Sequence, residues 1–446
     1  MATTPETSEV SIKRVAGASL IGTTIEFFDF FIFGTAAALV FNKLFFPDLE
    51  PLAGTLASFA TFGVAFAARP LGAVIFGHFG DRVSRKRMLV TSLMMMGIGT
   101  VAVGLLPTYD QVGVLAPILL VLCRLVQGLA LGGEWSGAVL MAVEHAPPEK
   151  RAFYGSWPQI GVPAGLVLAT GMFFLVQQLS DDALESWGWR VPFLVSSLLV
   201  ALGLYIRLKI EDSPAFREVK ENKQEHRFPA GTVFRRAGWR VLMGAMANGA
   251  ANIPFYMATV FVLSYGEDDG ISRNTMLGAV CLASAVQVVT IPIAATFCDR
   301  IGRRPIMLLG CVLTALMAFP FFWLVDTGST AAIILALLIA LPVCHTLTYG
   351  PLASFLPELF PTELRYSGSG IAYTLGGLLF SAPVPFVAAA LLDRFDASWP
   401  LSIYIIVGAV LTFIAVALAR ETRRDDIAWS LGDDDRERRT AAPSGV

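Results

Sequence analysis

Five charged residues lie inside long apolar runs, and each is a candidate for function. They are Glu26, Asp29, Arg69, Arg124 and Glu134. A charge at the centre of a membrane-spanning helix costs about 2.5 to 3.5 kcal/mol on insertion scales, so such residues usually serve a solute or ion pathway. Carboxylates there can exchange protons, and guanidinium groups pair with carboxylates. We therefore expect Asp29, Glu26 and Glu134 to handle protons, and Arg124 and Arg69 to bind an anionic solute.

Glu26 and Asp29 are three residues apart, so they share one face of a helix. We expect this face and that of Arg124 to converge on a central cavity, where opposite charges offset each other's desolvation. The alternative is a buried ion pair that only fixes helix packing. Such pairs are often neutral or unfavourable for stability compared with apolar replacements, which favours the functional reading.

Polar side chains recur every fourth residue in a later apolar run. Asn248, Asn252 and Tyr256 would form a stripe along one side of a helix. Such a stripe can hydrogen-bond a hydroxylated or carboxylated solute, or it can join neighbouring helices. We predict substrate binding for these three residues and for Gln287, and further donors from Tyr349 and Tyr373.

Two short charged phrases each occur twice. "DRVSRK" (81–86) is matched by "DRIGRR" (299–304), and "EHAPPEKR" (144–151) by "ELFPTELR" (358–365). We expect these clusters to clamp neighbouring helices in one conformation and to release them in another, whereas the alternative is that their cations only set topology. Because Glu134 is offset around its helix from Arg124, the alternative role for it is to engage Arg82 or Arg85. The candidate latch residues are Asp81, Arg82, Arg85, Asp299, Arg300, Arg303, Glu144, Arg151, Glu358 and Arg365.

The composition indicates a chain with many membrane spans. Only 15% of the 446 residues are charged, 55% are hydrophobic, and the mean hydropathy is +0.64. A crossing needs about 20 mainly apolar residues, so the length suits twelve. We predict all-α spans near 15–42, 54–79, 88–106, 112–143, 153–179, 190–208, 238–264, 274–298, 305–325, 330–355, 367–391 and 399–419.

The repeated phrases fall at matching places and predict a duplicated six-helix unit, with a site between the halves. The expected parts are an N-tail (1–14), a first bundle (15–208), a linker (209–237), a second bundle (238–420) and a C-tail (421–446). Basic residues concentrate in cytoplasmic loops. Because most of the 33 Lys and Arg fall on the side of the two tails, we expect both termini in the cytoplasm.

Several partners and cofactors are not expected. The net charge of −2 does not favour a nucleic-acid partner, and no phosphate-binding loop for ATP occurs. The five cysteines stand singly, without the spacing of a metal site or a disulfide framework. His78 and His345 are interpreted as packing residues. We predict no cofactor and no metal, and expect the partners to be protons, a small organic anion and the lipid bilayer.

The charged phrase "GHFGDRVSRKR" (77–87) resembles the cytoplasmic signature of the major facilitator superfamily, and "RLVQG" (124–128) resembles its fourth-helix motif. "IGTTIEFFDFFIFG" (21–34) and "WGWRVPFL" (187–194) are similar to the metabolite:H+ symporter family, and the first half looks most like bacterial shikimate transporters. Ser84 departs from the usual glycine of the signature, while the second copy keeps Gly302.

The resemblance implies two pseudo-symmetric six-helix bundles in an inner or plasma membrane and a proton-coupled importer of a small organic acid. Shikimate or a similar cyclic carboxylate is the first expectation for its substrate. A proline or betaine symporter and a drug-efflux antiporter of the same fold are the alternatives. The partial match of "GVPAG" (161–165) to the exporter motif disfavours efflux. No nucleophile motif or histidine-rich cluster indicates an enzyme.

Overall fold

A computed structural model of the protein describes residues 5–82, 85–144, 146–208, 229–268, 271–361 and 364–423. Within these ranges every regular element is helical. In the first half the elements are α1 (Pro5–Leu39), α2 (Phe41–Phe45), α3 (Pro51–Arg82), α4 (Arg85–Leu105), α5 (Tyr109–Val112), α6 (Leu115–Gly132), α7 (Glu134–Glu144), η1 (Pro148–Lys150), α8 (Arg151–Val176), α9 (Asp181–Ser186), η2 (Gly188–Arg190) and α10 (Val191–Leu208).

The second half contains the long helix α15 and two spans that each pass through a π-helical turn. Its elements are α12 (Pro229–Met246), α13 (Gly249–Tyr256), η3 (Met257–Phe261), α14 (Val262–Asp268), α15 (Arg273–Ile301), α16 (Arg303–Val325), α17 (Thr330–Ile339), η4 (Ala340–His345), α18 (Thr346–Glu358), α19 (Arg365–Phe380), α20 (Val384–Phe395) and α21 (Trp399–Leu418). Most of the predicted linker, 209–228, and the tail after residue 423 lie outside the described residues.

The predicted spans all coincide with helices. Among the described residues, 11 helices are long and apolar enough to cross a membrane, and the shorter apolar helix Val90–Leu105 occupies the place of the third span. Large apolar side chains point outward, including Leu198, Leu316 and Leu418. An outer surface of this kind suits lipid tails rather than water. The predicted fold class, an all-α membrane protein, is confirmed.

The same order of helix packing appears in both halves. In the first half α1 packs on α8, α3 on α6, and α4 on α10. In the second half α12 packs on α19, α15 on α17 and α18, and α16 on α21. The first, second and third spans of each half therefore pair with its fifth, fourth and sixth. The halves meet mainly where α8 packs on α15 and α3 on α19.

Some predicted spans are interrupted. The fourth span breaks at Gly133 between α6 and α7, and the seventh and tenth contain the π-helical turns η3 and η4. Pro254 precedes η3 and Pro342 lies within η4. Proline has no N–H to donate and clashes with the preceding turn, so it perturbs the regular α-helical pattern. A π-turn is one way to accommodate it, and such turns often mark functional sites.

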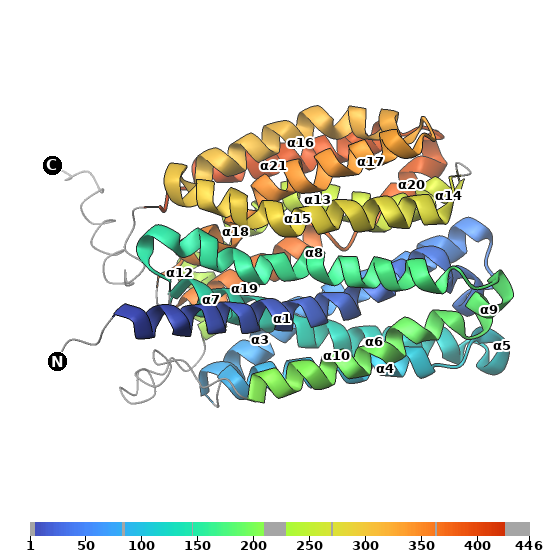
Figure 1. Cartoon of the computed structure of the whole chain (residues 1–446), viewed down its shortest axis with the longest axis horizontal. Helices are drawn as coiled ribbons and strands as arrows, with labels where there is room; N and C mark the ends of the chain where they lie inside the picture. The colour runs from blue at the N-terminus through green and yellow to red at the C-terminus, as the bar shows by residue number, and fades with distance from the viewer. Residues whose placement is uncertain are drawn as a thin grey trace.

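Figure 1 shows the long helices lying side by side along the long axis of the molecule, with α1 beginning and α21 ending at the same end of the bundle. We call this end the latch end. Asp299 and Arg303 lie there, at the junction of α15 and α16. The interior charges of the first half lie on α1, α3, α6 and α7, away from the outer surface.

Candidate functional site

Close packing of α3 against α6 positions the two interior arginines. A Cβ atom on Gly132 would lie 2.0 Å from the carbonyl oxygen of Arg69, and one on Gly128 would lie 2.3 Å from that of Ala65. Because only glycine permits such an approach, the two backbones come almost into contact. Arg69 on α3 is thereby brought close to Arg124, which lies about two turns before Gly132 on α6.

Arg69 is a buried cation with unused donors. Its side chain is 5% exposed, and its Cζ atom lies 4.1 Å from the centre of the Phe66 ring and 4.5 Å from that of Phe30. Its Nε and Nη2 atoms have no hydrogen-bond partner among the described residues. The polar groups that act on its charge are phenols of the second half, from Tyr256, Tyr349 and Tyr373.

Arg124 is fully buried and is held by a chain of polar side chains. Its Nη1 donates to Gln127 Oε1 at 2.8 Å, and Gln127 Nε2 donates to Thr100 Oγ1 at 2.8 Å. Its Cζ lies 3.9 Å from the centre of the Phe33 ring, while Nε and Nη2 have no partner in the described structure. The sequence analysis missed Gln127 and Thr100. The signal for Gln127 was its place three residues after Arg124, on the same helical face.

Asp29 is buried on α1 and accepts a hydrogen bond from Ser196 of α10. Its Oδ2 atom has no hydrogen-bond partner in the described structure, and the Thr100 hydroxyl lies beside its carboxylate. No ion pair joins Asp29 to Arg124 within the described ranges. Polar side chains rather than a direct contact therefore lie between the two charges. Glu26 is likewise buried on α1.

Glu134 is buried at the start of α7 and accepts a hydrogen bond from Ser92 Oγ at 3.0 Å. Ser92 belongs to α4, so this contact joins the third and fourth spans. The side chains of Arg82 and Arg85, the alternative partners predicted for Glu134, lie outside the described part of the structure.

The predicted polar stripe divides into members with different surroundings. Asn248 donates through Nδ2 to the carbonyl of Gly244 at 2.7 Å, and it packs so closely on α19 that a Cβ on Gly376 would lie 2.6 Å from its Cγ. Asn252 is buried one turn further along. Tyr256 reaches across to the first half, with its ring centre 5.5 Å from that of Phe66. Asn248 Nδ2 thus bonds to its own helix while Oδ1 has no hydrogen-bond partner among the described residues, and Tyr256 lies at the interface that contains Arg69.

Comparisons with known proteins identify the group to which this chain belongs. The Major Facilitator Superfamily profile matches residues 19–382. The chain belongs to this superfamily. It is 43% identical over 424 residues to the inner membrane metabolite transport protein YhjE of Escherichia coli (strain K12), covering 94% of this chain and 96% of that protein. It is 38% identical over 432 residues to the shikimate transporter of the same organism, covering 95% and 99%.

A solved structure supports the major facilitator fold. The partially occluded inward-open conformation of the E. coli xylose transporter XylE superposes with a TM-score of 0.74 at 16% identity, covering 93% of this chain and 99% of that one. The likeness bears on the fold alone. Together with the named relatives, it establishes a multi-pass membrane transporter of metabolites rather than an enzyme.

In this major facilitator protein, the second charged phrase joins the two halves at the latch end. Asp299 accepts hydrogen bonds from the backbone N–H groups of Ala152 and Phe153, each at 2.9 Å. These groups open α8, so a carboxylate of the second half caps a helix of the first, where the helix dipole favours negative charge. Arg303 holds Glu358 through two hydrogen bonds, at 3.2 and 2.9 Å, and lies 3.4 Å from Asp299.

The other predicted latch residues have varied surroundings. Arg365 is buried and donates to the carbonyl of Pro357 at 3.2 Å, Arg151 is buried at the start of α8, and Arg300 is exposed. Glu144 ends α7 and is half-buried. The first charged phrase is not described in the same detail, because the side chains of Asp81, Arg82 and Arg85, with that of His78, lie outside the described residues.

The start of the C-tail is part of the same network, which the sequence analysis did not predict. The Glu421 carboxylate accepts from the backbone N–H groups of Arg303 and Arg304 at 3.0 and 2.9 Å, and so caps α16. Thr422 donates to Glu358, and Arg423 Nε donates to the carbonyl of Asp299 at 2.9 Å. Gly302 has φ 129°, and a Cβ there would lie 2.7 Å from Glu421. The tight turn and the cap both require glycine at this position.

Aromatic and amide groups close the interface between the halves further along the bundle. The rings of Trp135 on α7 and Tyr373 on α19 stack in parallel, with centres 3.9 Å apart. Trp135 Nε1 donates to Gln159 at 2.8 Å, and Gln159 Nε2 donates to the carbonyl of Tyr349 at 3.0 Å. These contacts join α7 and α8 to α18 and α19. The halves are therefore in contact both at the latch end and beside Arg69.

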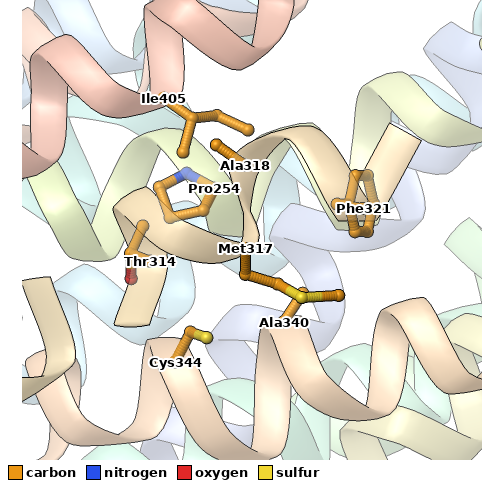
Figure 2. Close-up of a pocket in the computed structure, with 8 residues that line it drawn as sticks. All are labelled: Pro254, Thr314, Met317, Ala318, Phe321, Ala340, Cys344 and Ile405. Carbon is orange, nitrogen blue, oxygen red and sulfur yellow. The ribbon is translucent and has the colours of Figure 1, made fainter. Parts of the chain in front are cut away.

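A small apolar pocket lies behind η4, apart from this interface. Figure 2 shows Cys344 and Ala340 of η4 on one side of it and Pro254 and Thr314 on the others. The Thr314 hydroxyl is buried and has no hydrogen-bond partner among the described residues. Since the other lining groups are almost wholly apolar, the pocket offers a polar solute little to bind.

Proposed function

We propose that this transporter is a proton-coupled symporter that imports a small organic acid by alternating access. The observation that carries the proposal is the pair of buried guanidinium groups, Arg69 and Arg124, each with two nitrogens that have no hydrogen-bond partner in the described structure. A buried charge is costly unless it is paired. A substrate carboxylate would supply the missing negative charge and would accept the unused hydrogen bonds.

Arg69 is the stronger candidate for the carboxylate, because it lies between the two halves. The phenols of Tyr256 and Tyr349 approach it from the second half, so an anion bound there would contact both bundles. Binding would then favour the conformation in which the halves close around the substrate. Arg124 lies deeper among the phenylalanine rings and adds positive charge nearby.

Asp29 is the proposed proton carrier, with Glu26 and Glu134 as further candidates. Protonation of Asp29 removes an uncompensated negative charge from the interior. The transporter with its substrate bound can then change conformation without an unpaired charge inside the membrane. Thr100 and Gln127 lie between Asp29 and Arg124, so the charge state of one group can affect the other through them. One proton moved through 100 mV supplies about 2.3 kcal/mol.

We propose that the latch end faces the cytoplasm of a cell with an inner or plasma membrane, with both termini on that side. The excess of Lys and Arg in the connections on this side supports the orientation. In the proposed cycle the cap of Asp299 on α8 opens when the carrier faces inward and re-forms when it faces outward. The boundaries at 15–208 and 238–420 are the proposed limits of the two moving bundles.

The test is uptake of radiolabelled shikimate by proteoliposomes that contain the purified protein. An imposed inward proton gradient should drive accumulation, and a protonophore should abolish it. Accumulation that is equal with and without the proton gradient would contradict coupling of transport to protons. Uptake of proline or betaine instead of any carboxylic acid would support the alternative substrate class, and loading of a lipophilic dye into energised inside-out vesicles would support efflux.

A further inference from the structure

Among the described residues, four buried side-chain atoms of the second half have no hydrogen-bond partner, on Asn248, Gln287, Thr314 and Tyr349. Two of these side chains, Gln287 and Tyr349, contact His345. The atoms beside His345 are Oε1 of Gln287 on α15 and the hydroxyl of Tyr349 on α18, and the Tyr349 hydroxyl faces the phenol of Tyr373. Gln287 is 0% exposed and Tyr349 is 3% exposed. Leaving a buried hydrogen-bonding atom unsatisfied costs about 1 to 3 kcal/mol. Gln287 Oε1 is therefore an acceptor that a ligand could satisfy, and the Tyr349 phenol lies in the same cluster.

The π-helical turn η4 fixes the orientation of Gln287. The carbonyl of Leu341 accepts a hydrogen bond from Gln287 Nε2 at 2.9 Å, which identifies that atom as the amide nitrogen and leaves Oε1 as a free acceptor. The same nitrogen lies 2.5 Å from His345 Nδ1. Since Nδ1 faces a donor, the ring carries its proton on Nε2. The cluster is therefore neutral and rigid, and its open acceptor is Gln287 Oε1.

Ring stacking holds Tyr349 in place. The rings of His345 and Tyr349 are 4.8 Å apart with 19° between their planes, and Phe255 packs on His345 at 4.6 Å. The Tyr349 phenol also acts on the charge of Arg69. The neutral cluster thus adjoins the guanidinium that we assign to the substrate carboxylate, on the opposite side of the interface between the halves.

We propose that Gln287 and Tyr349 form a subsite for a hydroxyl group of the transported acid. The substrate hydroxyl would donate to Gln287 Oε1, and Tyr349 would bind the same or a neighbouring hydroxyl. The transported class is then a hydroxylated carboxylic acid rather than an unsubstituted one. This inference rests on the proposed function, because it takes the carboxylate to be bound at Arg69.

The chemistry of the free acceptor separates this class from a betaine. A quaternary ammonium group has no N–H or O–H to donate, so it would leave Gln287 Oε1 unsatisfied. The aromatic rings around His345 pack on one another rather than around an open cage, and cation–π recognition of quaternary ammonium requires such a cage. A site built to bind a hydroxyl also discriminates strongly against an analogue that lacks it.

The test compares two cyclic acids that differ in their hydroxyl groups. Shikimate has three, and 1-cyclohexene-1-carboxylate has none. Isothermal titration calorimetry on the purified full-length protein in detergent gives a Kd for each. We expect shikimate to bind the wild type at least about tenfold more tightly, the effect of roughly one buried hydrogen bond.

Two variants test which residues cause the difference in affinity between the two acids. Gln287→Leu should weaken shikimate binding by about tenfold and leave the affinity for 1-cyclohexene-1-carboxylate within about twofold, because Arg69 is intact. Tyr349→Phe keeps the ring stacked on His345 and should weaken shikimate binding severalfold more than binding of 1-cyclohexene-1-carboxylate, which meets this phenol only through its carboxylate. If Gln287→Leu does not fold, Tyr349→Phe decides. The matched control is Thr314→Val, which removes another partnerless hydroxyl from the pocket behind η4 and should change neither affinity.

The outcomes separate the two proposals. If the wild type binds both acids equally well, the hydroxyl subsite is wrong and carboxylate binding stands; a bound water would then be what satisfies Gln287. If the variants weaken both acids equally, the two residues only support the fold, and the subsite is again wrong. If the wild type binds neither acid but binds betaine or proline, both the subsite and the proposed substrate class fail.

Discussion

Arg69 and Arg124 are cations held among phenylalanine rings, and the way each is held differs. Arg124 donates to Gln127, which in turn donates to Thr100, whereas Arg69 is approached by phenols of the other half. A guanidinium over an aromatic face is stabilised by cation–π attraction, but its unused N–H groups still favour an anion. Because Arg69 faces groups of both halves, we expect substrate recognition to depend most on this residue.

Arg69→Ala should reduce shikimate uptake at low concentration by about 10- to 100-fold, since hydrogen bonds to charged groups contribute about 1.5 to 3 kcal/mol. Arg69→Lys keeps the charge but loses the paired geometry, so it should retain intermediate uptake. Initial rates in proteoliposomes measure both. Arg394→Ala, at an exposed position, is the control. Wild-type uptake by Arg69→Ala would remove the assigned role.

Arg124→Ala should also abolish uptake while the protein remains in the membrane, because the positive charge beside Arg69 and the link to Gln127 are both lost. Gln127→Leu breaks the link but keeps the charge, and it should impair uptake less. Membrane fractions and uptake rates report the two effects separately. Normal transport by Arg124→Ala would show that this cation serves packing alone.

Asp29→Asn keeps the shape of the side chain and its bond to Ser196 but cannot release a proton. We expect this variant to lose gradient-driven accumulation and to keep exchange of labelled for unlabelled substrate. Its uptake should also lose most of its dependence on pH. Asp393→Asn, at an exposed position, should behave as the wild type. An unchanged pH profile in Asp29→Asn would place the proton on another group.

Side-chain types within the apolar runs predicted the interior charges, but not their partners. Asp29, Arg69 and Arg124 stand out in sequence because a charge there is costly. The direct approach of Asp29 to Arg124 was an expectation from helical faces, and the structure places Thr100 and Gln127 between them. Those contacts depend on the rotation of α4 and α6 about their axes, which a single sequence does not specify.

At the scale of the helix, glycines decide which backbones can meet. α3 and α6 approach so closely that Gly132 and Gly128 have no room for a side chain. Without a hydrophobic driving force between helices inside the bilayer, such close packing is a main source of helix association. The positions of Arg69 and Arg124 follow from this contact.

Gly132→Ala should therefore lower the melting temperature of the purified protein, because its Cβ would lie 2.0 Å from a backbone oxygen and overpacking costs about 1 to 3 kcal/mol. Gly171→Ala in α8 is the matched control, since nothing lies within 4 Å of the added Cβ. It should be neutral or slightly stabilising. Equal melting temperatures for the two variants would show that the α3–α6 contact relaxes easily.

Because the Asp299 carboxylate caps α8, removing its charge should change the packing at the latch end. Asp299→Asn should loosen this contact and expose Cys298, which is buried there with Ala152. In a background that lacks the other four cysteines, Cys298 should react several times faster with a maleimide. Glu421→Gln, which weakens the cap on α16, should have a smaller effect. Unchanged labelling in Asp299→Asn would mean that the cap does not keep the latch end closed.

The positions of the helices could be predicted where the apolar runs end at proline, glycine or charged residues. They were harder to predict where a helix continues through a local distortion. The hydropathy pattern located every span. It did not predict η3 and η4, because a π-turn inserts one residue without interrupting the apolar run. The folding of Glu421 back onto α16 was also unpredictable, since it depends on a contact between segments over one hundred residues apart.

At the scale of the whole molecule, the two halves share an order of packing but differ in chemistry. The buried charges of the membrane interior lie on the first half, and the second half contributes phenols, amides and His345. The repeated charged phrases predicted the duplication. The pairing of α8 with α15 and of α3 with α19 brings both kinds of group to one interface. A substrate bound there would contact both bundles, as alternating access requires.

The central claim is that protons and an organic acid cross together, and one measurement tests it most directly. Proteoliposomes without an imposed gradient are placed in a weakly buffered medium, and the external pH is recorded when shikimate is added. We predict a rise in external pH that matches shikimate uptake and is absent in Arg69→Ala and Asp29→Asn. Shikimate uptake by the wild type with no change in external pH would contradict the account.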